Sequence, residues 1–169
     1  GVNVRATRIT YVGELGWELY LPVDSGLVLW KEIIKIGSEF GLKTCGYRAI
    51  ESLRLEKGYR AWGTEISTET NPWEAGLGFA VSLEKNSFLG KTSSVVLKEN
   101  QSRKLVPIIF DDIRQVPLGN EPIRANGEVI GRVKSGGQGY TINRAIGYAY
   151  VPMKYSLPGE VVEVEFFGK

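Results

Sequence analysis

The chain has 169 residues, of which 43% are hydrophobic, enough to bury the core of one ordinary domain or of two small ones. It contains no histidine, which excludes a Ser-His-Asp triad, a Cys-His pair and any histidine-containing zinc site within this chain. Its single cysteine, Cys45, excludes an internal disulfide and a thiolate metal cluster. The net charge of +2 is too balanced to indicate a nucleic-acid or membrane partner, and no stretch approaches the roughly 20 apolar residues of a membrane span.

The first part of the chain predicts two strands followed by a helix. Apolar and polar residues alternate over residues 2–11 and again over residues 17–21, which is typical of half-buried strands. Asp24 or Ser25 can cap the helix that follows, and Gly41 is a suitable residue to end it.

The middle of the chain predicts a second helix and then mostly loops. Residues 46–57 carry an apolar stripe at helical spacing, and residues 59–75 have the composition of a loop. Residues 79–83 predict a strand, and a short helix follows Gly90. The polar stretch 98–104 indicates a boundary between two parts of the chain.

The last third predicts strands separated by turns. Residues 105–110, 142–151 and 161–167 are strand-like, and Asn126-Gly127 is typical of a type I′ hairpin turn. The glycine-rich stretch 135–139 predicts a turn between barrel strands. Several strands without a long helix indicate a small antiparallel barrel or sandwich.

The predicted fold class is therefore α+β, with an α/β part over residues 1–100 and a β-barrel part over residues 101–169. The chain has no initiator methionine, and both its ends lie close to predicted strands. We expect a piece of a longer polypeptide, cut on both sides, so that the barrel is truncated.

The first candidate site residue is Glu18. Strand alternation places Glu18 and Tyr20 on the face opposite Trp17 and Leu19. A carboxylate there offers two acceptor oxygens to a planar N–H edge, such as that of a guanidinium or a pterin. The alternative is an exposed glutamate on an amphipathic strand, which is the more common situation; Glu14, in the preceding turn, fits a solvated loop charge still better.

The second candidate is the segment around the end of the second helix. Glu51 and Arg54 lie one turn apart and predict a solvated charged face with a small stabilising effect. Tyr59, Arg60 and Trp62 follow and can line a slot for a ring, although core packing is the more common fate of such aromatic residues.

Two further clusters predict less. The segment Ser135–Thr141, preceded by Arg132 and Lys134, has glycines and basic neighbours that can cradle a phosphate, but it lacks the spacing of a phosphate-binding loop. The adjacent pair Asp111-Asp112 would face opposite ways on a strand, and we assign no metal site.

Taken together, these motifs resemble the folate-dependent aminomethyltransferase family, best known from the glycine cleavage T-protein. The resemblance covers nearly the whole chain, in order. The segment 46–63 is most similar to the C-terminal region of dimethylglycine and sarcosine dehydrogenases and dimethylglycine oxidase. The motifs that carry it are Tyr11-Val-Gly-Glu-Leu-Gly-Trp-Glu18, Thr70-Asn-Pro-Trp-Glu-Ala-Gly-Leu-Gly-Phe79, Phe88-Leu-Gly-Lys91, the Asn126-Gly hairpin, the Ser135-Gly stretch and Ala149-Tyr-Val-Pro152.

This resemblance implies a ferredoxin-like pair of α/β domains with a C-terminal barrel, arranged around a hole that holds tetrahydrofolate. The chain would supply the second half of that pair and the barrel. By the resemblance, Glu18 binds the pterin ring, and Tyr11 and Tyr59 lie in the folate site. The T-protein branch has an arginine where this chain has Ile50, which favours the dehydrogenase-like branch.

The resemblance also implies the reaction, in which a one-carbon unit passes from a small amine-derived aminomethyl or iminium donor to tetrahydrofolate. The catalytic aspartate of the family belongs to the missing N-terminal half, so we assign no catalytic residue here. FAD would require an upstream dehydrogenase domain. We expect a cytoplasmic protein, or a mitochondrial matrix protein if it is eukaryotic, without a nucleic-acid or membrane partner.

Two alternatives remain open. The first is a binding or regulatory module that kept the fold and lost the chemistry, as in the pyruvate dehydrogenase phosphatase regulatory subunit, which the family also resembles. The second is a phosphate or nucleic-acid binder built on Arg132, Lys134 and the glycine-rich stretch, which the balanced net charge disfavours.

Overall fold

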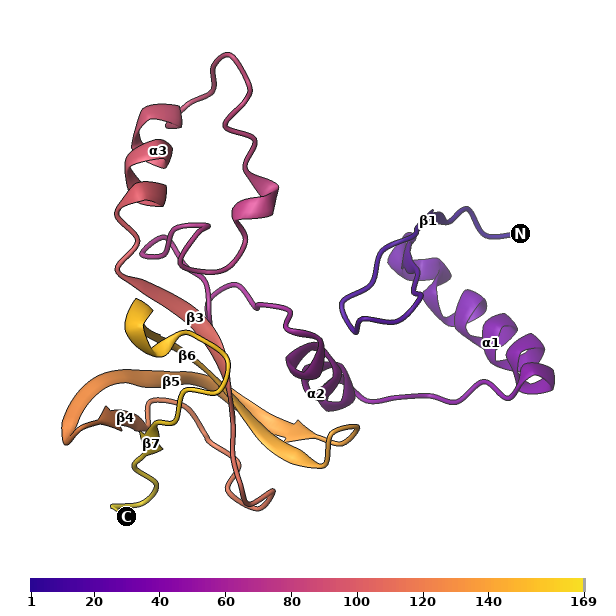
Figure 1. The fold of residues 1–169 in the computed structure, drawn as a ribbon. Coiled ribbons are helices and arrows are strands. Elements are labelled where there is room, and N and C mark those ends of the chain that lie inside the picture. The colour runs from indigo at the N-terminus through magenta and orange to yellow at the C-terminus, as the bar shows by residue number, and fades with distance from the viewer. Residues whose placement is uncertain (169) are drawn as a thin grey trace. The chain divides into compact units, whose positions relative to one another are not determined.

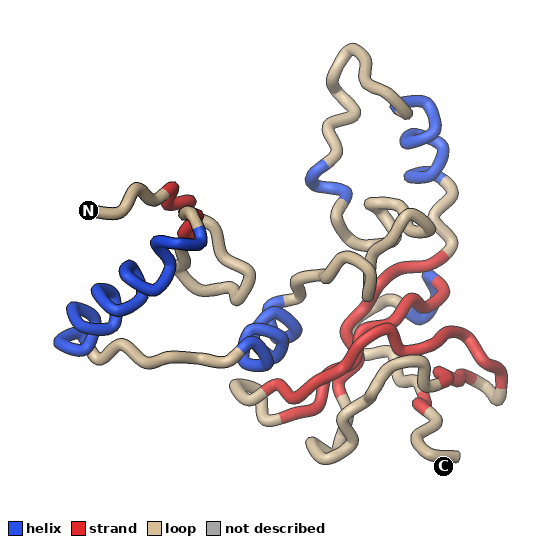
Figure 2. The backbone as a smooth tube through the Cα atoms, turned by 180° about the vertical axis from the view of Figure 1, so that it is seen from behind, coloured by secondary structure: helices blue, strands red, loops and turns tan. Residues whose placement is uncertain are grey.

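The computed structural model of the protein describes residues 1–168. The chain divides into two compact units, one covering Gly1–Tyr59 and the other beginning at Arg60. Figures 1 and 2 show that the helix α1 belongs to the first unit and that most of the strands belong to the second. None of the described helices has the length and apolar character needed to cross a membrane. The domain division at residues 100 and 101 stays a prediction.

The first unit contains one pair of short strands. β1 (Arg5–Thr7) pairs antiparallel with β2 (Glu18–Tyr20), so that Thr7 lies opposite Glu18 and Arg5 opposite Tyr20. Both strands are shorter than predicted. Residues 8–17 form a loop instead: the backbone N–H of Ile9 bonds back to the carbonyl of Thr7 directly after β1, and Gly13 later in the loop adopts a left-handed φ of 81°.

Two helices complete this unit, as predicted. A 3₁₀ turn, η1 (Val23–Ser25), leads into α1 (Gly26–Gly37), which continues as a second 3₁₀ turn, η2 (Ser38–Phe40). Gly41 then ends the helix at a φ of 73°, which confirms the predicted stop. The predicted side-chain cap is wrong: Ser25 makes no capping bond, because the preceding 3₁₀ turn already leads the backbone into the helix. α2 (Tyr47–Lys57) ends at Gly58, also left-handed.

The first unit buries very little of its apolar surface. Leu55 is the one hydrophobic residue that is buried within the described residues 1–59. Large apolar side chains are instead exposed on the loop before β2, on η1, on α1 and on η2, among them Leu15, Trp17, Val23, Leu27, Trp30, Ile36 and Phe40. A unit of this kind lacks the burial that normally offsets the entropy of folding, so it calls for a partner surface.

The second unit begins with loops and short helices. Residues 60–75 form a loop, as predicted, followed by the 3₁₀ turn η3 (Gly78–Ala80) and the helix α3 (Lys91–Glu99). The predicted strand at 79–83 is wrong. The amides of Ala80 and Val81 bond back to the carbonyls of Leu77 and Gly78, so local turns replace strand pairing.

An antiparallel sheet forms the rest of the second unit. Its strand order is β3-β6-β5-β4-β7. The strands are β3 (Arg103–Ile109), β4 (Pro122–Ala125), β5 (Glu128–Gly139), β6 (Arg144–Pro152) and β7 (Glu163–Val164); a 3₁₀ turn, η4 (Met153–Tyr155), follows β6. Asn126 and Gly127 connect β4 to β5 with φ values of 52° and 82°, which confirms the predicted hairpin. β7 is shorter than the predicted strand at 161–167.

β3 and β7 are the two edges of the described sheet. The outer side of β3 is partly used: the backbone N–H of Leu105 donates to the carbonyl of Glu74, at 2.7 Å. The hydrophobic core of this sheet is formed by side chains of β4, β5 and β6. It consists of Ile123, Val133, Ala149 and Val151, with partly buried apolar residues around them. The predicted α+β class agrees with this arrangement of helices and antiparallel sheets.

The glycine-rich stretch is not a turn, which corrects the prediction for residues 135–139. It is the second half of β5, where Gly136 lies opposite Gly147 of β6. The ring and the carbonyl oxygen of Pro117 pack directly on Gly136, and a Cβ atom there would lie 2.6 Å from that oxygen. The glycine therefore allows a close approach of backbone to the sheet.

Replacing Gly136 by alanine should lower the free energy of unfolding by about 1–3 kcal/mol, because the added methyl group overlaps the rigid ring and backbone of Pro117. Chemical denaturation of both proteins measures the difference. Gly26→Ala is the control, since Gly26 has helical backbone angles and open space at its Cβ position. Equal stabilities for Gly136→Ala and the wild type would contradict this account of the glycine.

Candidate functional site

Glu18 lies on the face of the strand pair that forms a hollow. The register of β1 and β2 places the side chains of Arg5 and Thr7 on the same face as those of Glu18 and Tyr20. These four residues and Ile9 line a hollow of about 320 Å³. The Glu18 side chain is half-buried, so its carboxylate borders the hollow without being removed from water.

Glu18 and Tyr20 interact directly. The Tyr20 hydroxyl donates a short hydrogen bond to Oε2 of Glu18. This bond, together with the negative charge of Glu18, raises the pKa of the Tyr20 phenol above its usual value, because ionisation would place two negative charges side by side. A carboxylate has about four lone-pair sites, so Glu18 retains acceptor capacity toward the hollow.

The structure brings Tyr11 and Tyr59 together. Their rings stack with centroids 5.9 Å apart and planes inclined by 18°. Gly13 helps to make this approach possible, since a side chain there would collide with Lys57 at the end of α2. Because a third ring would need roughly 3.5 Å on each side, no ring fits between the two tyrosines; the pair forms a flat wall.

Arg54 holds Tyr59 in place, and its environment differs from the prediction. Its side chain is fully buried, and it donates to Oε1 of Glu51 from Nε at 3.1 Å and to the carbonyl of Tyr59 from Nη1 at 3.0 Å. The predicted solvated face is therefore wrong at this position. The sequence carried one usable signal: a basic residue in the last turn before Gly58 can bond the carbonyls at a helix end.

Trp62 and Arg60 each make their own contacts within the second unit. Trp62 is 71% exposed and lines an apolar pocket of about 220 Å³ with Ile66, Pro72 and Leu77, among others. Arg60 donates from Nε to the carbonyl of Ala75, at 2.8 Å. That Tyr59, Arg60 and Trp62 together line a slot for a ring stays a prediction.

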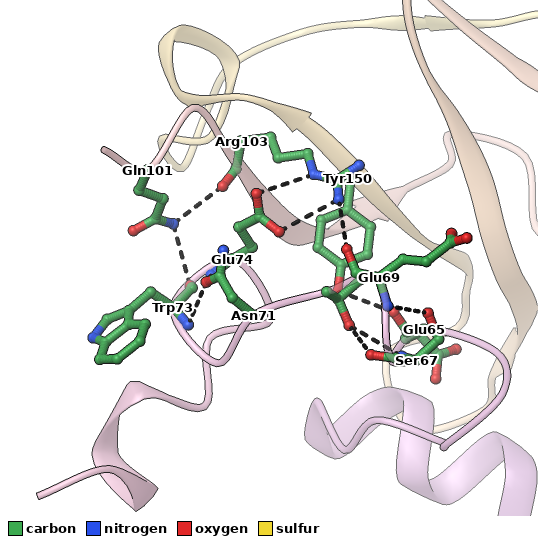
Figure 3. Close-up of polar contacts among 10 residues, drawn as sticks. Glu65, Ser67, Glu69, Asn71, Trp73, Glu74, Gln101, Arg103 and Tyr150 are labelled. Atoms are coloured by element: carbon green, nitrogen blue, oxygen red, sulfur yellow. Dashed lines mark hydrogen bonds and ion pairs between the residues drawn. The ribbon is translucent and has the colours of Figure 1, made fainter. Parts of the chain in front are cut away.

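The sequence analysis missed a buried carboxylate, Glu65, which is only 1% exposed. Figure 3 shows it among polar contacts that connect the loop 60–75 with the sheet. Its Oε1 accepts a short hydrogen bond from Ser135, and its Oε2 accepts from the backbone N–H of Ala61 at 2.6 Å. The Tyr150 hydroxyl donates to the Glu65 carbonyl at 2.9 Å. The burial of Glu65 could not be predicted from the composition of the loop, because the sequence does not show what the loop folds against.

Neither of the remaining clusters forms a binding site. Because the glycine-rich stretch is paired with β6 along its length, its backbone is engaged in the sheet and does not form a phosphate-binding nest. Asp112 pairs with Arg114, whose hydrogen bonds lower the pKa of that carboxyl to about 2. The described residues contain no group of three or more metal-ligating carboxylates or thiolates.

The contact between Glu18 and Tyr20 predicts how Tyr20 titrates. Replacing Glu18 by glutamine removes the negative charge, so the pKa of the Tyr20 phenol should fall toward its ordinary value. Ultraviolet titration of tyrosinate, with the wild-type curve subtracted, measures the change. Glu14→Gln serves as the control; identical titration curves for Glu18→Gln and the wild type would contradict the contact.

Comparisons with known proteins identify the two parts of the chain as domains of one family. Residues 1–85 match the family described as the GCVT N-terminal domain, and residues 103–169 match the glycine cleavage T-protein C-terminal barrel domain. Mouse mitochondrial dimethylglycine dehydrogenase is 43% identical over 99% of this chain, and aminomethyltransferase of Halothermothrix orenii is 41% identical over 97%.

A solved structure adds the fold. The glycine cleavage system aminomethyltransferase T of Bartonella henselae superposes with a TM-score of 0.86 at 31% identity, over 97% of this chain. The chain spans 20% of the mouse dehydrogenase and 46% of each of the two aminomethyltransferases. On the strength of both domain matches, the chain belongs to the aminomethyltransferase family of the glycine cleavage T-protein and the dimethylglycine dehydrogenases.

Proposed function

We propose that the chain is part of a tetrahydrofolate-dependent aminomethyltransferase, within which it supplies one side of the folate site. In this proposal the complete protein moves a one-carbon unit from a small amine-derived donor to tetrahydrofolate. The observation that carries the proposal is the position of Glu18, a half-buried carboxylate on the hollowed face of the strand pair. Membership of the family supports tetrahydrofolate as the ligand, and the geometry supports Glu18 as a residue that binds it.

The residues around Glu18 fit a pterin ring. A pterin presents adjacent N–H groups on one edge, and a carboxylate can accept from both in a planar, paired arrangement. Tyr20 bonds to only one oxygen of Glu18, which leaves acceptor capacity for such an edge. The flat wall of Tyr11 and Tyr59 provides an aromatic surface within the same unit, and on its outer side a ligand ring can stack.

In the bound state tetrahydrofolate supplies the nitrogen atoms that receive the one-carbon unit. The residues of this chain bind and orient that ligand: Glu18 fixes the pterin edge, and Tyr11 and Tyr59 exclude water from one side. We assign no catalytic group to the chain, and we place the proton-transferring residue in the missing half.

The exposed apolar surface of the first unit supports such a missing half. Leu19 lies on the strand face opposite Glu18, Trp17 is exposed just before that strand, and Trp30 and Ile36 are exposed on α1. These side chains are suited to a hydrophobic interface of the size found inside a domain. We infer that the preceding part of the polypeptide covers them and completes a ferredoxin-like pair.

Within the family, the proposal favours the branch of the dimethylglycine and sarcosine dehydrogenases. Ile50 is partly exposed on α2, where it offers no guanidinium to a ligand. FAD would then belong to an upstream domain, and the compartment of the complete protein stays a prediction.

Glu18→Gln should weaken tetrahydrofolate binding by the complete protein roughly 30- to 1000-fold, equivalent to about 2–4 kcal/mol. The reason is that glutamine places an amide donor against a donor of the ring. The measurement is a tetrahydrofolate titration followed by quenching of tryptophan fluorescence. Glu14→Gln is the matched control, because its exposed side chain lies in the turn. If Glu14→Gln binds tetrahydrofolate more weakly than Glu18→Gln does, then Glu14 and not Glu18 binds the pterin, and the proposed assignment is wrong.

A second test concerns the chain by itself. Because it lacks one wall of the proposed site, we expect the purified chain to form no methylene-tetrahydrofolate from any amine, whereas the complete protein does. The assay is the formation of methylene-tetrahydrofolate at saturating donor. Turnover by the chain alone would place the catalytic group among its own residues, against the proposal.

A further inference from the structure

The loop over residues 60–75 has the features of an Ω loop. Its two ends are held together, since Nε of Arg60 donates to the carbonyl of Ala75 at 2.8 Å. Inside it, the amides of Glu65 and Ile66 bond to the carbonyl of Ala61, and Gly63 bonds to the carbonyl of Ile66. Loops of this compact kind are frequently functional, and this one follows directly on Tyr59 in the chain.

Glu65 fixes the shape of this loop through both of its carboxylate oxygens. One oxygen holds the N–H of Ala61 within the loop, and the other accepts from Ser135 on β5. Glu65 and Ser135 are both buried. Burying a carboxylate costs free energy unless its oxygens accept hydrogen bonds. The bonds that satisfy the Glu65 carboxylate also hold the loop in one conformation.

These contacts join the two matched regions of the family. The loop lies in the region of the GCVT N-terminal domain, and Ser135 and Tyr150 lie in the barrel region. Further bonds cross the same boundary: Arg103 forms an ion pair with Glu74 at 3.2 Å, and its guanidinium lies 4.9 Å from the centre of the Tyr150 ring. Figure 3 shows these side chains together. The loop is thus held in shape by the sheet against which it folds.

We propose that Glu65 is a positioning residue, which through its bonds to Ala61 and Ser135 restrains the backbone that follows Tyr59 and so sets the position of that proposed folate-contacting residue. This inference rests on the proposed function. Ala61 lies two residues after Tyr59, so the bond from its N–H to Glu65 restrains the backbone just beyond a proposed ligand-contacting residue. The barrel region then acts on the backbone next to Tyr59 through Ser135 and Glu65.

The choice of a carboxylate makes the proposal testable. Alanine at position 65 would leave the N–H of Ala61 and the hydroxyl of Ser135 without this partner. Glutamine can preserve both bonds, because its oxygen can accept from Ala61 while its amide donates to the Ser135 hydroxyl. Glu69 lies in the same loop with an exposed side chain. Glu69→Gln therefore removes one negative charge from the loop and leaves the bonds of Glu65 in place.

The experiment measures the KM for tetrahydrofolate and kcat of the complete protein, at a temperature at which every variant is folded. Glu65→Ala should raise KM roughly 10- to 100-fold, while kcat at saturating folate falls less than about threefold. Glu65→Gln should recover most of the loss, and Glu69→Gln should match the wild type. If Glu65→Ala does not fold, Tyr150→Phe removes only the hydroxyl that holds the Glu65 carbonyl, and it should raise KM in the same direction.

Hydrogen exchange of the Ala61 amide is the second readout. In Glu65→Ala this amide should exchange faster than in the wild type, while the amides of β6 keep their protection. A lower melting temperature with unchanged KM would mean that Glu65 only stabilises the fold, and it would overturn the proposal. A wild-type protein that binds no folate would instead overturn the proposed function itself, so the two failures are distinguishable.

Discussion

The arrangement of the second unit depends on the burial of β6 on both faces. Every residue from Ala145 to Val151 is buried. Ala149 and Val151 pack into the core with Ile123 and Val133. Tyr148 and Tyr150 point to the opposite face, and a strand covered on both faces needs a second layer there. Loop 60–75 contributes to that layer, since Tyr150 bonds to the backbone of Glu65.

The need to satisfy polar groups under that layer explains several otherwise unusual residues. Burying Tyr150 raises the pKa of its phenol and requires a hydrogen-bond partner, which the loop backbone provides. Ser135, opposite Tyr148 on β5, likewise bonds to Glu65. The loop is therefore irregular in secondary structure and yet well defined by its contacts.

The sequence predicted those features that depend on neighbouring residues alone. Gly41 and the Asn126-Gly127 pair were placed correctly because left-handed backbone conformations favour these residue types in any protein. The face of Glu18 followed from strand alternation. Such local rules also reached the two helices of the first unit, whose apolar spacing is regular.

Most of the features that were missed depend on distant partners. Arg54 is the exception: it is typical of a solvated helix face, but it is buried and bonds to Glu51 and to the carbonyl of Tyr59, five residues along the chain. Gly136 was predicted in a turn, because nothing near it in sequence indicates that Pro117 packs on it. Glu65 depends on Ser135, which is far along the chain. The long-range packing of the second unit decides all but the first of these cases.

The bond between Leu105 and Glu74 has a further consequence for the solution behaviour of the protein. Alternate residues of β3 direct their N–H groups away from β6, and Leu105 and Pro107 are among them. The backbone N–H of Leu105 already donates to the carbonyl of Glu74, and Pro107 has no N–H. An incoming strand of another molecule therefore finds few donors along this edge. The protein is protected here against the edge-to-edge aggregation to which open sheets are prone.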